Sequence, residues 1–407
     1  MQRTKTAKRT AGSALAHATI MVLALAAILT AIFRITTAEY VRSRQWRDET
    51  RSFYIAEAGM NEALGTLIVE GKAALLALSY PRTMGSGTYS VDVVLGEDDP
   101  ILLDWRIRLS AFGAEGRARS GIQVVAWAIP NGEYTFAAFG EDGVLLNSNA
   151  YIDSYDSNDG PYPGLEPSGY FGNVGSNEDI ELDANAQIYG DTVPGPDGVL
   201  IDSDPNTYVF GATSSADDDV VLDPVIVPVV PPTGFMVVAG TQTLGPGSVH
   251  KTAISVKAGG LLKLVGPAVV VIDDLELLSN SNLVVDATAG PVEIYGTGDF
   301  ELKSNSSVTT LADQAKDISV FLTADTDASP AKVVSLNSNS QFTGTIYAPE
   351  ADLTLKSNFN LFGAVVGESV TLASNSALHF DEDLMYLDGI EPEYAQLSWR
   401  VLSEQEE

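Results

Sequence analysis

Two groups of closely spaced aspartates are the residues in this sequence that could bind a metal ion. One group is Asp153, Asp156 and Asp159, and the other is Asp217, Asp218 and Asp219. Carboxylate oxygens are the ligands that calcium prefers. Neither group matches the D-x-[DN]-x-[DN]-G loop, and the Gly-Gly-x-Gly-x-Asp calcium repeat does not occur in the sequence. We therefore expect solvated acidic loops at both places, with calcium binding as the alternative.

Other catalytic groups are scarce. The chain has no Cys and only three His, at positions 17, 250 and 379. This composition excludes disulfides, thiolate metal sites and Cys nucleophiles, and it leaves little material for zinc sites or His-based triads. A polysaccharide lyase or hydrolase would need paired carboxylates or a repeated basic group on one wall. Residues 131–407 contain only seven Lys and Arg400. We expect a protein that is not an enzyme and has no cofactor and no small-molecule substrate.

Charge is distributed very unevenly along the 407 residues. Residues 1–52 carry a net charge of +6, whereas residues 53–407 carry −37. An acidic surface of this kind repels nucleic acid and anionic lipid, and it attracts divalent cations or basic partners. The sequence therefore argues against nucleic-acid binding.

The segment Ala11–Phe33 is apolar and is bounded by Arg9 and Arg34. As a helix it would be about 34 Å long, which is enough to cross the hydrocarbon core of a bilayer. A cleaved secretory signal is the alternative, but that would have a shorter apolar core and a small-residue cleavage site. His17 is an ionisable residue inside the span and is therefore a candidate assembly residue. We expect a retained single membrane span, whose orientation the flanking charges leave open.

Apolar residues recur at helical spacing after the span. They are Phe53, Ala56, Met60, Ala63, Leu64, Leu67 and Ile68. This spacing predicts an amphipathic helix with one buried stripe. No Pro interrupts the region, so one helix is expected from Ala11 to about Leu78.

The basic N-terminus, the apolar span and the stretch FYIAEAGMNEAL together resemble pilin-like proteins of pilus assembly with a PilX-type N-terminal region. The Ala-Glu-Ala-Gly element lies at Ala56–Gly59. The resemblance implies packing of this helix against neighbouring subunits, with Glu57 pairing to a neighbour's arginine or simply exposed. Processing between Gly12 and Ser13 would put His17 where a pilin has glutamate. An intact anchor is the alternative to processing.

Three runs with alternating β-branched and aromatic residues follow, at 87–96, 102–113 and 119–129. They predict a small antiparallel sheet. A long helix packed on such a sheet is the pilin-like α+β arrangement.

A repeat of the form Leu-x-[Ser/Ala]-Asn-x-x-apolar occurs seven times. Its asparagines are Asn149, Asn185, Asn280, Asn305, Asn339, Asn358 and Asn375. So short a unit must stack on its neighbours to bury its apolar residues, and Asn accepts the left-handed backbone of a tight corner. The repeat predicts a parallel β-helix of about ten turns, about 50 Å tall. It also resembles the β-helical C-terminal domain of some pilus-assembly proteins.

The sequence thus predicts a mainly β protein with an N-terminal helix. The expected parts are a basic segment (1–10), a transmembrane helix (11–33), an amphipathic continuation (34–80), a small antiparallel sheet (81–130), a parallel β-helix (131–390) with loop insertions near 153–173 and 191–234, and an acidic tail (391–407). Trp399 and Leu402 in the tail are expected to cap the last turn.

The function that fits this organisation is non-enzymatic. We expect a membrane-anchored, pilin-like protein that assembles a type IV pilus or pseudopilus with pilin-like subunits or pilus machinery. Its acidic ectodomain would lie on the periplasmic or extracellular side. One alternative is a cell-surface adhesin whose Asp-rich loops bind a glycan, a surface or calcium. Another is a self-associating β-helical scaffold.

Overall fold

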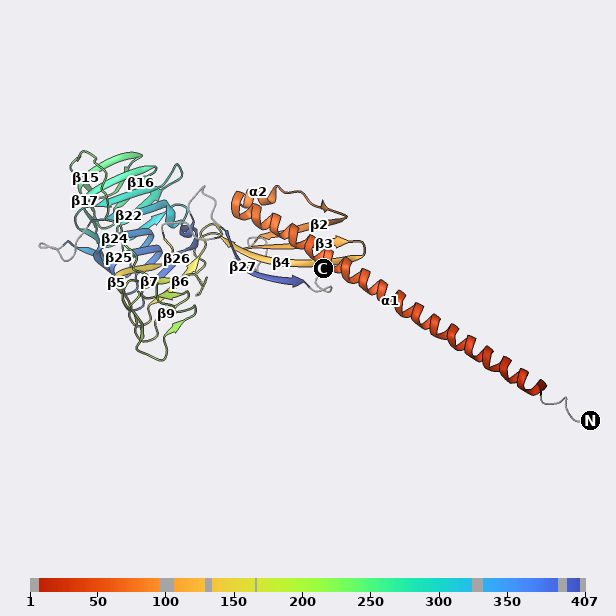
Figure 1. Cartoon of the computed structure of the whole chain (residues 1–407). Helices are drawn as coiled ribbons and strands as arrows, with labels where there is room; N and C mark the ends of the chain where they lie inside the picture. Colours follow the sequence, from red (N-terminus) through yellow and green to blue (C-terminus); the bar gives the residue numbers. More distant parts are fainter. Residues whose placement is uncertain are drawn as a thin grey trace, which may run out of the picture. The chain divides into compact units, whose positions relative to one another are not determined.

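The computed structural model describes residues 7–95, 106–128, 134–164, 167–323, 332–386 and 394–402. The chain forms two compact units, each described here by itself (Figure 1). Unit 1 comprises Met1–Ile129 and Glu391–Glu407, and unit 2 comprises Pro130–Ile390. The expectation of a mainly β protein with one long N-terminal helix and an antiparallel sheet is confirmed.

Unit 1 begins with the long helix α1 (Ala7–Glu70), followed by the short helix α2 (Lys72–Leu76). The sequence predicted one helix to about Leu78, whereas the structure interrupts it at Gly71. The φ angle of Gly71 is 87°. Side-chain-bearing residues rarely adopt this backbone, so the glycine ends α1 where a β-carbon would have favoured continuation.

The unit 1 sheet has five strands in the order β1-β2-β3-β4-β27, and every neighbouring pair is antiparallel. The strands are β1 (Arg82–Met84), β2 (Gly87–Leu95), β3 (Arg106–Glu115), β4 (Ala118–Ala128) and β27 (Tyr394–Leu402). The three predicted strands correspond to β2, β3 and β4, while residues 96, 102–105 and 129 of those predictions lie outside the described residues.

The predicted role of the C-terminal tail was wrong. Trp399 and Leu402 belong to β27, which pairs with β4 in unit 1 instead of capping unit 2. Tyr394–Leu402 is a run of alternating residues that adds an edge strand to a sheet formed almost 270 residues earlier. The whole of unit 2 is therefore inserted between two adjacent strands of unit 1.

Unit 2 contains 22 strands among the described residues, and every pairing between them is parallel. They are β5 (Ala138–Leu146), β6 (Tyr151–Tyr155), β7 (Val174–Ser176), β8 (Ile180–Leu182), β9 (Gln187–Ile188), β10 (Thr192–Val193), β11 (Leu200–Asp202), β12 (Tyr208–Val209), β13 (Phe235–Val238), β14 (Thr241–Leu244), β15 (Gly247–Val256), β16 (Leu261–Val265), β17 (Ala268–Leu277), β18 (Asn282–Asp286), β19 (Val292–Gly296), β20 (Phe300–Leu302), β21 (Ser307–Thr310), β22 (Ile318–Leu322), β23 (Val334–Leu336), β24 (Gln341–Leu355), β25 (Asn360–Leu372) and β26 (Ala377–Asp381). Two 3₁₀ turns, Ala315–Asp317 and Glu382–Met385, complete the unit.

Successive coils of the chain stack in unit 2 to form a column, but not in simple sequence order. The first strands, β5 and β6, pair with the last strands, β25 and β26. From β5 and β6 the chain winds through β7–β9 to β10–β12 at one end of the column. It resumes at β13 and β14, which pair among the described residues with β15 and β16, and winds back towards β5.

Residues 214–234, here called the strap, connect the two ends of the column. Asn177 exchanges two hydrogen bonds with the Val220 backbone, at 2.8 and 2.7 Å. The Tyr347 hydroxyl donates to the Asp223 carbonyl (2.6 Å), and the Thr233 amide donates to the His250 carbonyl (2.8 Å). The prediction of a loop insertion at 191–234 was therefore wrong, because this segment supplies β10–β12 and then runs along the column.

The seven repeat asparagines all occupy left-handed corners, with φ between 56° and 62°. The leucine that opens each repeat and the apolar residue that closes it are at most 2% exposed. Amide side chains on neighbouring coils also meet, since Asn149 donates to Asn375 and Asn358 donates to Asn339, each at 3.2 Å. The repeat thus forms the turn and the core of each coil together.

Candidate assembly surface and a buried polar centre

The first part of α1 exposes its apolar side chains. Leu23, Ile28 and Phe33 are each more than half exposed, and none of the most apolar 18-residue window, whose mean hydropathy is 2.3, is buried. By length and composition this is the one helix among the described residues able to span a membrane. Gly12 and Ser13 lie in the same helix, and the exposed His17 follows them.

Hydroxyl groups in this part of α1 are satisfied within the helix. Thr19, Thr30, Thr36 and Thr37 each donate to the carbonyl four residues earlier, at 2.7 to 2.9 Å. Such bonds let a polar side chain sit in an apolar environment without an unpaired donor. The threonines are therefore compatible with a membrane-spanning or helix-packing surface.

The second part of α1 is buried against the unit 1 sheet. Of the predicted stripe, Ala56, Met60, Ala63 and Leu67 are at most 3% exposed, while Ile68 is 48% exposed. Phe53 and Leu64 are only partly buried, so three of the seven predicted residues lie outside the fully buried face.

The Ala-Glu-Ala-Gly element makes the close contact between α1 and the sheet. A β-carbon added at Gly113 of β3 would lie 2.1 Å from the Ser52 carbonyl oxygen and 2.4 Å from the Ala56 nitrogen. One added at Gly59 would lie 2.6 Å from the Tyr89 ring. Small residues at Ala56 and Gly59 thus let the helix backbone approach two strands, while Glu57 remains partly exposed.

A charged cluster next to this contact was not predicted from the sequence. Glu62 of α1 accepts hydrogen bonds from Arg82 and from the Tyr89 hydroxyl, the latter at 2.8 Å. Burial, and then the hydrogen bond to Glu62, raise the pKa of Tyr89. Glu115, the last residue of β3, is 8% exposed and accepts from Ser86 at 2.6 Å, with Arg51 of α1 at 3.5 Å. These pairs fix the rotation of α1 on the sheet.

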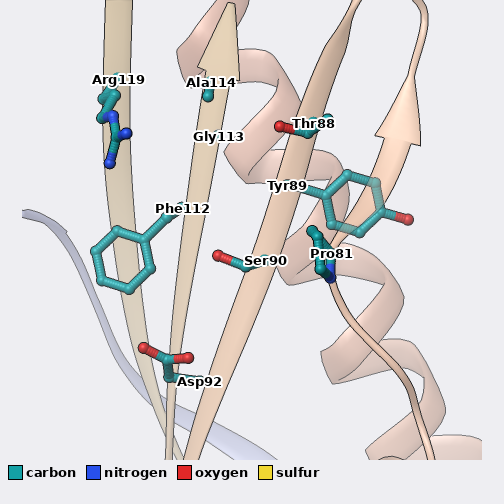
Figure 2. Close-up of a pocket in the computed structure, with 9 residues that line it drawn as sticks. All are labelled: Pro81, Thr88, Tyr89, Ser90, Asp92, Phe112, Gly113, Ala114 and Arg119. Carbon is teal, nitrogen blue, oxygen red and sulfur yellow. The ribbon is translucent and has the colours of Figure 1, made fainter.

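Figure 2 shows a pocket of about 370 Å³ on the face of the sheet turned away from α1. Strand register places Ser90 opposite Phe112, and Ala114 opposite Arg119. The small side chains leave the space beside the Phe112 ring empty, with Arg119 towards one end and Asp92 towards the other. The pocket therefore combines an apolar floor with one charge of each sign.

A buried polar centre in unit 2 is built around Asp153, which is completely buried. Its Oδ1 lies 2.6 Å from Nδ1 of His379, which is only 3% exposed. Its Oδ2 accepts from the hydroxyls of Tyr151 (3.2 Å) and Tyr162 (3.0 Å) and from the Ser168 amide (2.9 Å). Both carboxylate oxygens are therefore occupied by donors, which is the arrangement of a structural hub.

The same centre holds residues 156–171 against the column. The Phe171 amide donates to Ser154 Oγ, whose hydrogen goes to Glu382 at 2.6 Å. The buried carboxylate of Asp381 accepts from the amides of Ser157 (3.1 Å) and Ala315 (3.0 Å), and burial raises its pKa. The loop insertion predicted near 153–173 is thus tied down at several points, although residues 165–166 lie outside the described residues.

The other calcium candidates are not brought together. Asp156 accepts from the Asn158 amide at 2.8 Å, and burial raises its pKa to about 6. Asp159 and all three of Asp217, Asp218 and Asp219 are exposed. In the described part of the chain, no three or more His, Asp or Glu side chains form a group that could hold a metal ion.

His250 fastens the strap at one end of the column. Its Nδ1 lies 2.8 Å from the Val230 carbonyl oxygen, and its Nε2 lies 2.9 Å from Oδ1 of Asp273. Both partners are acceptors, so the arrangement favours the doubly protonated ring. The hydrogen bond to Asp273, and then that to Val230, raise the pKa of His250.

Comparisons with known proteins match one family model and one solved structure to this chain. A family model described as "Domain of unknown function (DUF7305)" matches residues 200–387, which lie in unit 2. No curated protein matches the chain. Among solved structures, the crystal structure of the competence-associated pilin ComZ from Thermus thermophilus matches 87% of this chain and 98% of its own, at 12% identity and a TM-score of 0.28. So low a score establishes neither a shared fold nor a shared role.

Proposed function

We propose that the protein is a membrane-anchored, pilin-like subunit with a PilX-type N-terminal region that takes part in assembling a type IV pilus or pseudopilus. The observation that carries the proposal is the division of α1. Its first part leaves a row of large apolar side chains uncovered, and its second part is buried on an antiparallel sheet. A globular protein does not leave so large an apolar surface in water.

The mechanism is helix packing in the membrane and in the assembled filament. Removing one Leu or Ile side chain of the span from water lowers the free energy by about 1.5–3 kcal/mol. Transfer of the span into lipid or between helices is therefore strongly favourable. Glu57 is partly exposed in the second part of α1, which packs on the sheet. It would pair with an arginine of a neighbouring subunit, and its substitution Glu57→Gln tests that role separately.

We also propose that unit 2 is a parallel β-helix presented on the periplasmic or extracellular side as an acidic, non-enzymatic ectodomain. Uniformly parallel pairing, left-handed Asn corners and inward-pointing Leu residues support this assignment. The net charge of −37 over residues 53–407 favours a location away from anionic lipid.

Processing of the N-terminus distinguishes two forms of the proposal. Cleavage between Gly12 and Ser13 would release a mature chain with His17 at its fifth position. An uncleaved chain would keep residues 1–12 as part of the anchor. N-terminal sequencing of the purified protein separates the two, because the first form begins at Ser13 and the second at Met1 or Gln2.

The assembly role is tested by co-purification from the native host. We expect the full chain to appear with pilus or pseudopilus components in sheared filament and crosslinked membrane fractions. The variant Ile28→Lys should lose this association, whereas Ile28→Leu should retain it. If the wild-type protein fractionates only with bulk membrane and crosslinks to no pilus component, the proposal is wrong.

A further inference from the structure

A second pocket, in unit 2, has the composition of a ligand site. It has a volume of about 150 Å³ and lies where the loop after β6 folds back over β24 and β25. Three aromatic residues, three polar residues and one proline line it: Tyr155, Tyr162, Phe362, Asp313, Gln341, Thr343 and Pro161. They come from four separate stretches of the chain, which explains why the sequence did not reveal them.

The aromatic residues form one continuous wall. The ring of Tyr162 lies 5.6 Å from those of both Tyr155 and Phe362, and Tyr155 meets Phe362 edge-on at 6.4 Å. Behind them, His379 stacks on Phe362 at 4.9 Å and lies 3.9 Å from Tyr162. The wall is therefore held by the Asp153–His379 centre, and Tyr162 is fixed further by its hydrogen bond to Asp153.

The Tyr155 side chain lines this pocket, and the residue is only 4% exposed. Burial, and then the carboxylates of Asp381, Asp313 and Asp156, raise the pKa of Tyr155. Its phenol therefore stays protonated and can donate a hydrogen bond to a ligand hydroxyl.

Asp313 contributes a second unusual feature. It is the only residue other than Asn and Gly with a positive φ among the described residues, at 55°. Every other non-glycine residue in this conformation is a repeat asparagine at a corner. A strained backbone at a pocket commonly holds a side chain where a ligand needs it. Here Asp313 lines the pocket together with Gln341 and Thr343 of β24.

We propose that this pocket binds a single pyranose ring, such as the terminal residue of a surface glycan. Sugar rings present apolar C–H faces that pack on aromatic rings and hydroxyls that need both donors and acceptors. The aromatic wall supplies a surface on which the C–H face of a sugar can pack. Tyr155, Asp313, Gln341 and Thr343 supply hydrogen-bond donors and acceptors for its hydroxyls. A volume of about 150 Å³ lies below the roughly 300–1,000 Å³ of sites for larger ligands, which restricts the occupant to one ring.

The test uses the full chain in a zwitterionic detergent, because detergents with sugar head groups would compete. D-glucose, D-galactose, D-mannose and N-acetyl-D-glucosamine are titrated separately by saturation-transfer NMR. We expect at least one to bind, and we expect Tyr155→Phe, Asp313→Asn and Gln341→Ala each to weaken it about tenfold, the loss of one well-placed hydrogen bond. Asp313→Asn keeps a residue that tolerates the left-handed backbone while removing the charge.

Tyr208→Phe is the matched control, since it removes a phenol hydroxyl from an exposed residue of β12 and should leave binding unchanged. Circular dichroism of each variant establishes that the column is intact. The proposal is overturned if none of the four sugars binds, or if binding is equally strong in all three pocket variants. Preferential binding of indole or phenol over the sugars would also overturn it, by identifying an aromatic ligand or side chain as the occupant.

Discussion

Units 1 and 2 bury their apolar residues in opposite ways. The column of unit 2 encloses its apolar side chains within one continuous core. Unit 1 covers only the second part of α1 with its sheet and leaves Leu15–Phe33 with no protein cover. Unit 2 therefore encloses its apolar core by itself, whereas the first part of α1 exposes its apolar side chains, which is the basis of the proposed membrane and helix packing.

This difference bears on how substitutions should act. In unit 2 a lost methyl or hydrogen bond is lost from the folded chain itself and lowers its free energy of unfolding. In the first part of α1 the same change affects association and leaves folding in detergent unchanged. The four tryptophans at 46, 105, 127 and 399 all belong to unit 1. Tryptophan fluorescence therefore follows unit 1, while far-UV circular dichroism at the β-sheet minimum follows mainly unit 2.

The largest expected effect is a cavity in the column. Phe342 is fully buried, and Phe342→Ala should lower the free energy of unfolding of unit 2 by about 3–5 kcal/mol. Ile28→Ala, on the exposed part of α1, should change it by less than about 0.5 kcal/mol. Urea titrations in detergent, followed by circular dichroism, measure both. Equal losses in the two variants would mean that the uncovered helix is packed within the protein itself.

The next effect concerns the contact between α1 and its sheet. Gly113→Ala forces a β-carbon against the Ser52 carbonyl and should destabilise unit 1 by about 1–3 kcal/mol. Gly65→Ala is the matched control, because nothing lies within 4 Å of its added β-carbon and the helix gains about 0.5–1 kcal/mol. Tryptophan fluorescence during urea unfolding should move in opposite directions for the two variants. A neutral Gly113→Ala would show that the helix does not approach β3 so closely.

A smaller effect is expected at the corners of the column. Asn358 has φ of 57°, and Asn358→Ala should cost about 1–2 kcal/mol because alanine disfavours this backbone. Asn358→Gly also removes the amide that bonds to Asn339 but accepts the left-handed conformation, so it should cost less. The difference between the two unfolding midpoints isolates the backbone contribution. If glycine is as damaging as alanine, the stacked amide is the more important feature.

Local patterns were sufficient to predict the elements but not how they come together. Helical spacing identified Ala56, Met60, Ala63 and Leu67, and the repeat identified every left-handed asparagine corner, because both depend on neighbours a few residues away. Strand pairing in unit 2 depends on residues far apart in sequence. The contact of β25 with β5 is of this kind and has no local signature.

The missed sites have the same cause. Asp153 meets His379 across 226 positions, and the sequence gives no sign that this aspartate is buried and not in solvent. The Pro and Asp residues of the strap predict a loop, yet prolines also suit an extended segment that pairs with few neighbours. The edge strand β27 could have been recognised from its alternating residues, but its partner could not.

The smallest effect should appear at the clasp between the strap and the column. Because the folded pKa of His250 lies above its ordinary value of 6.5, the protonated ring stabilises the folded column fully below pH 6.5. That contribution is lost as the pH rises through the folded pKa. His250→Gln should therefore unfold at a lower urea concentration than wild type near pH 6, and the gap should close towards pH 9. Asp156 titrates in the same range, because its pKa is about 6. Its contribution is the same in wild type and variant, so it cancels in the difference between their unfolding midpoints at each pH. A gap that stays constant from pH 6 to 9 would mean that the ring is neutral in the folded protein and that the strap is held by its backbone hydrogen bonds alone.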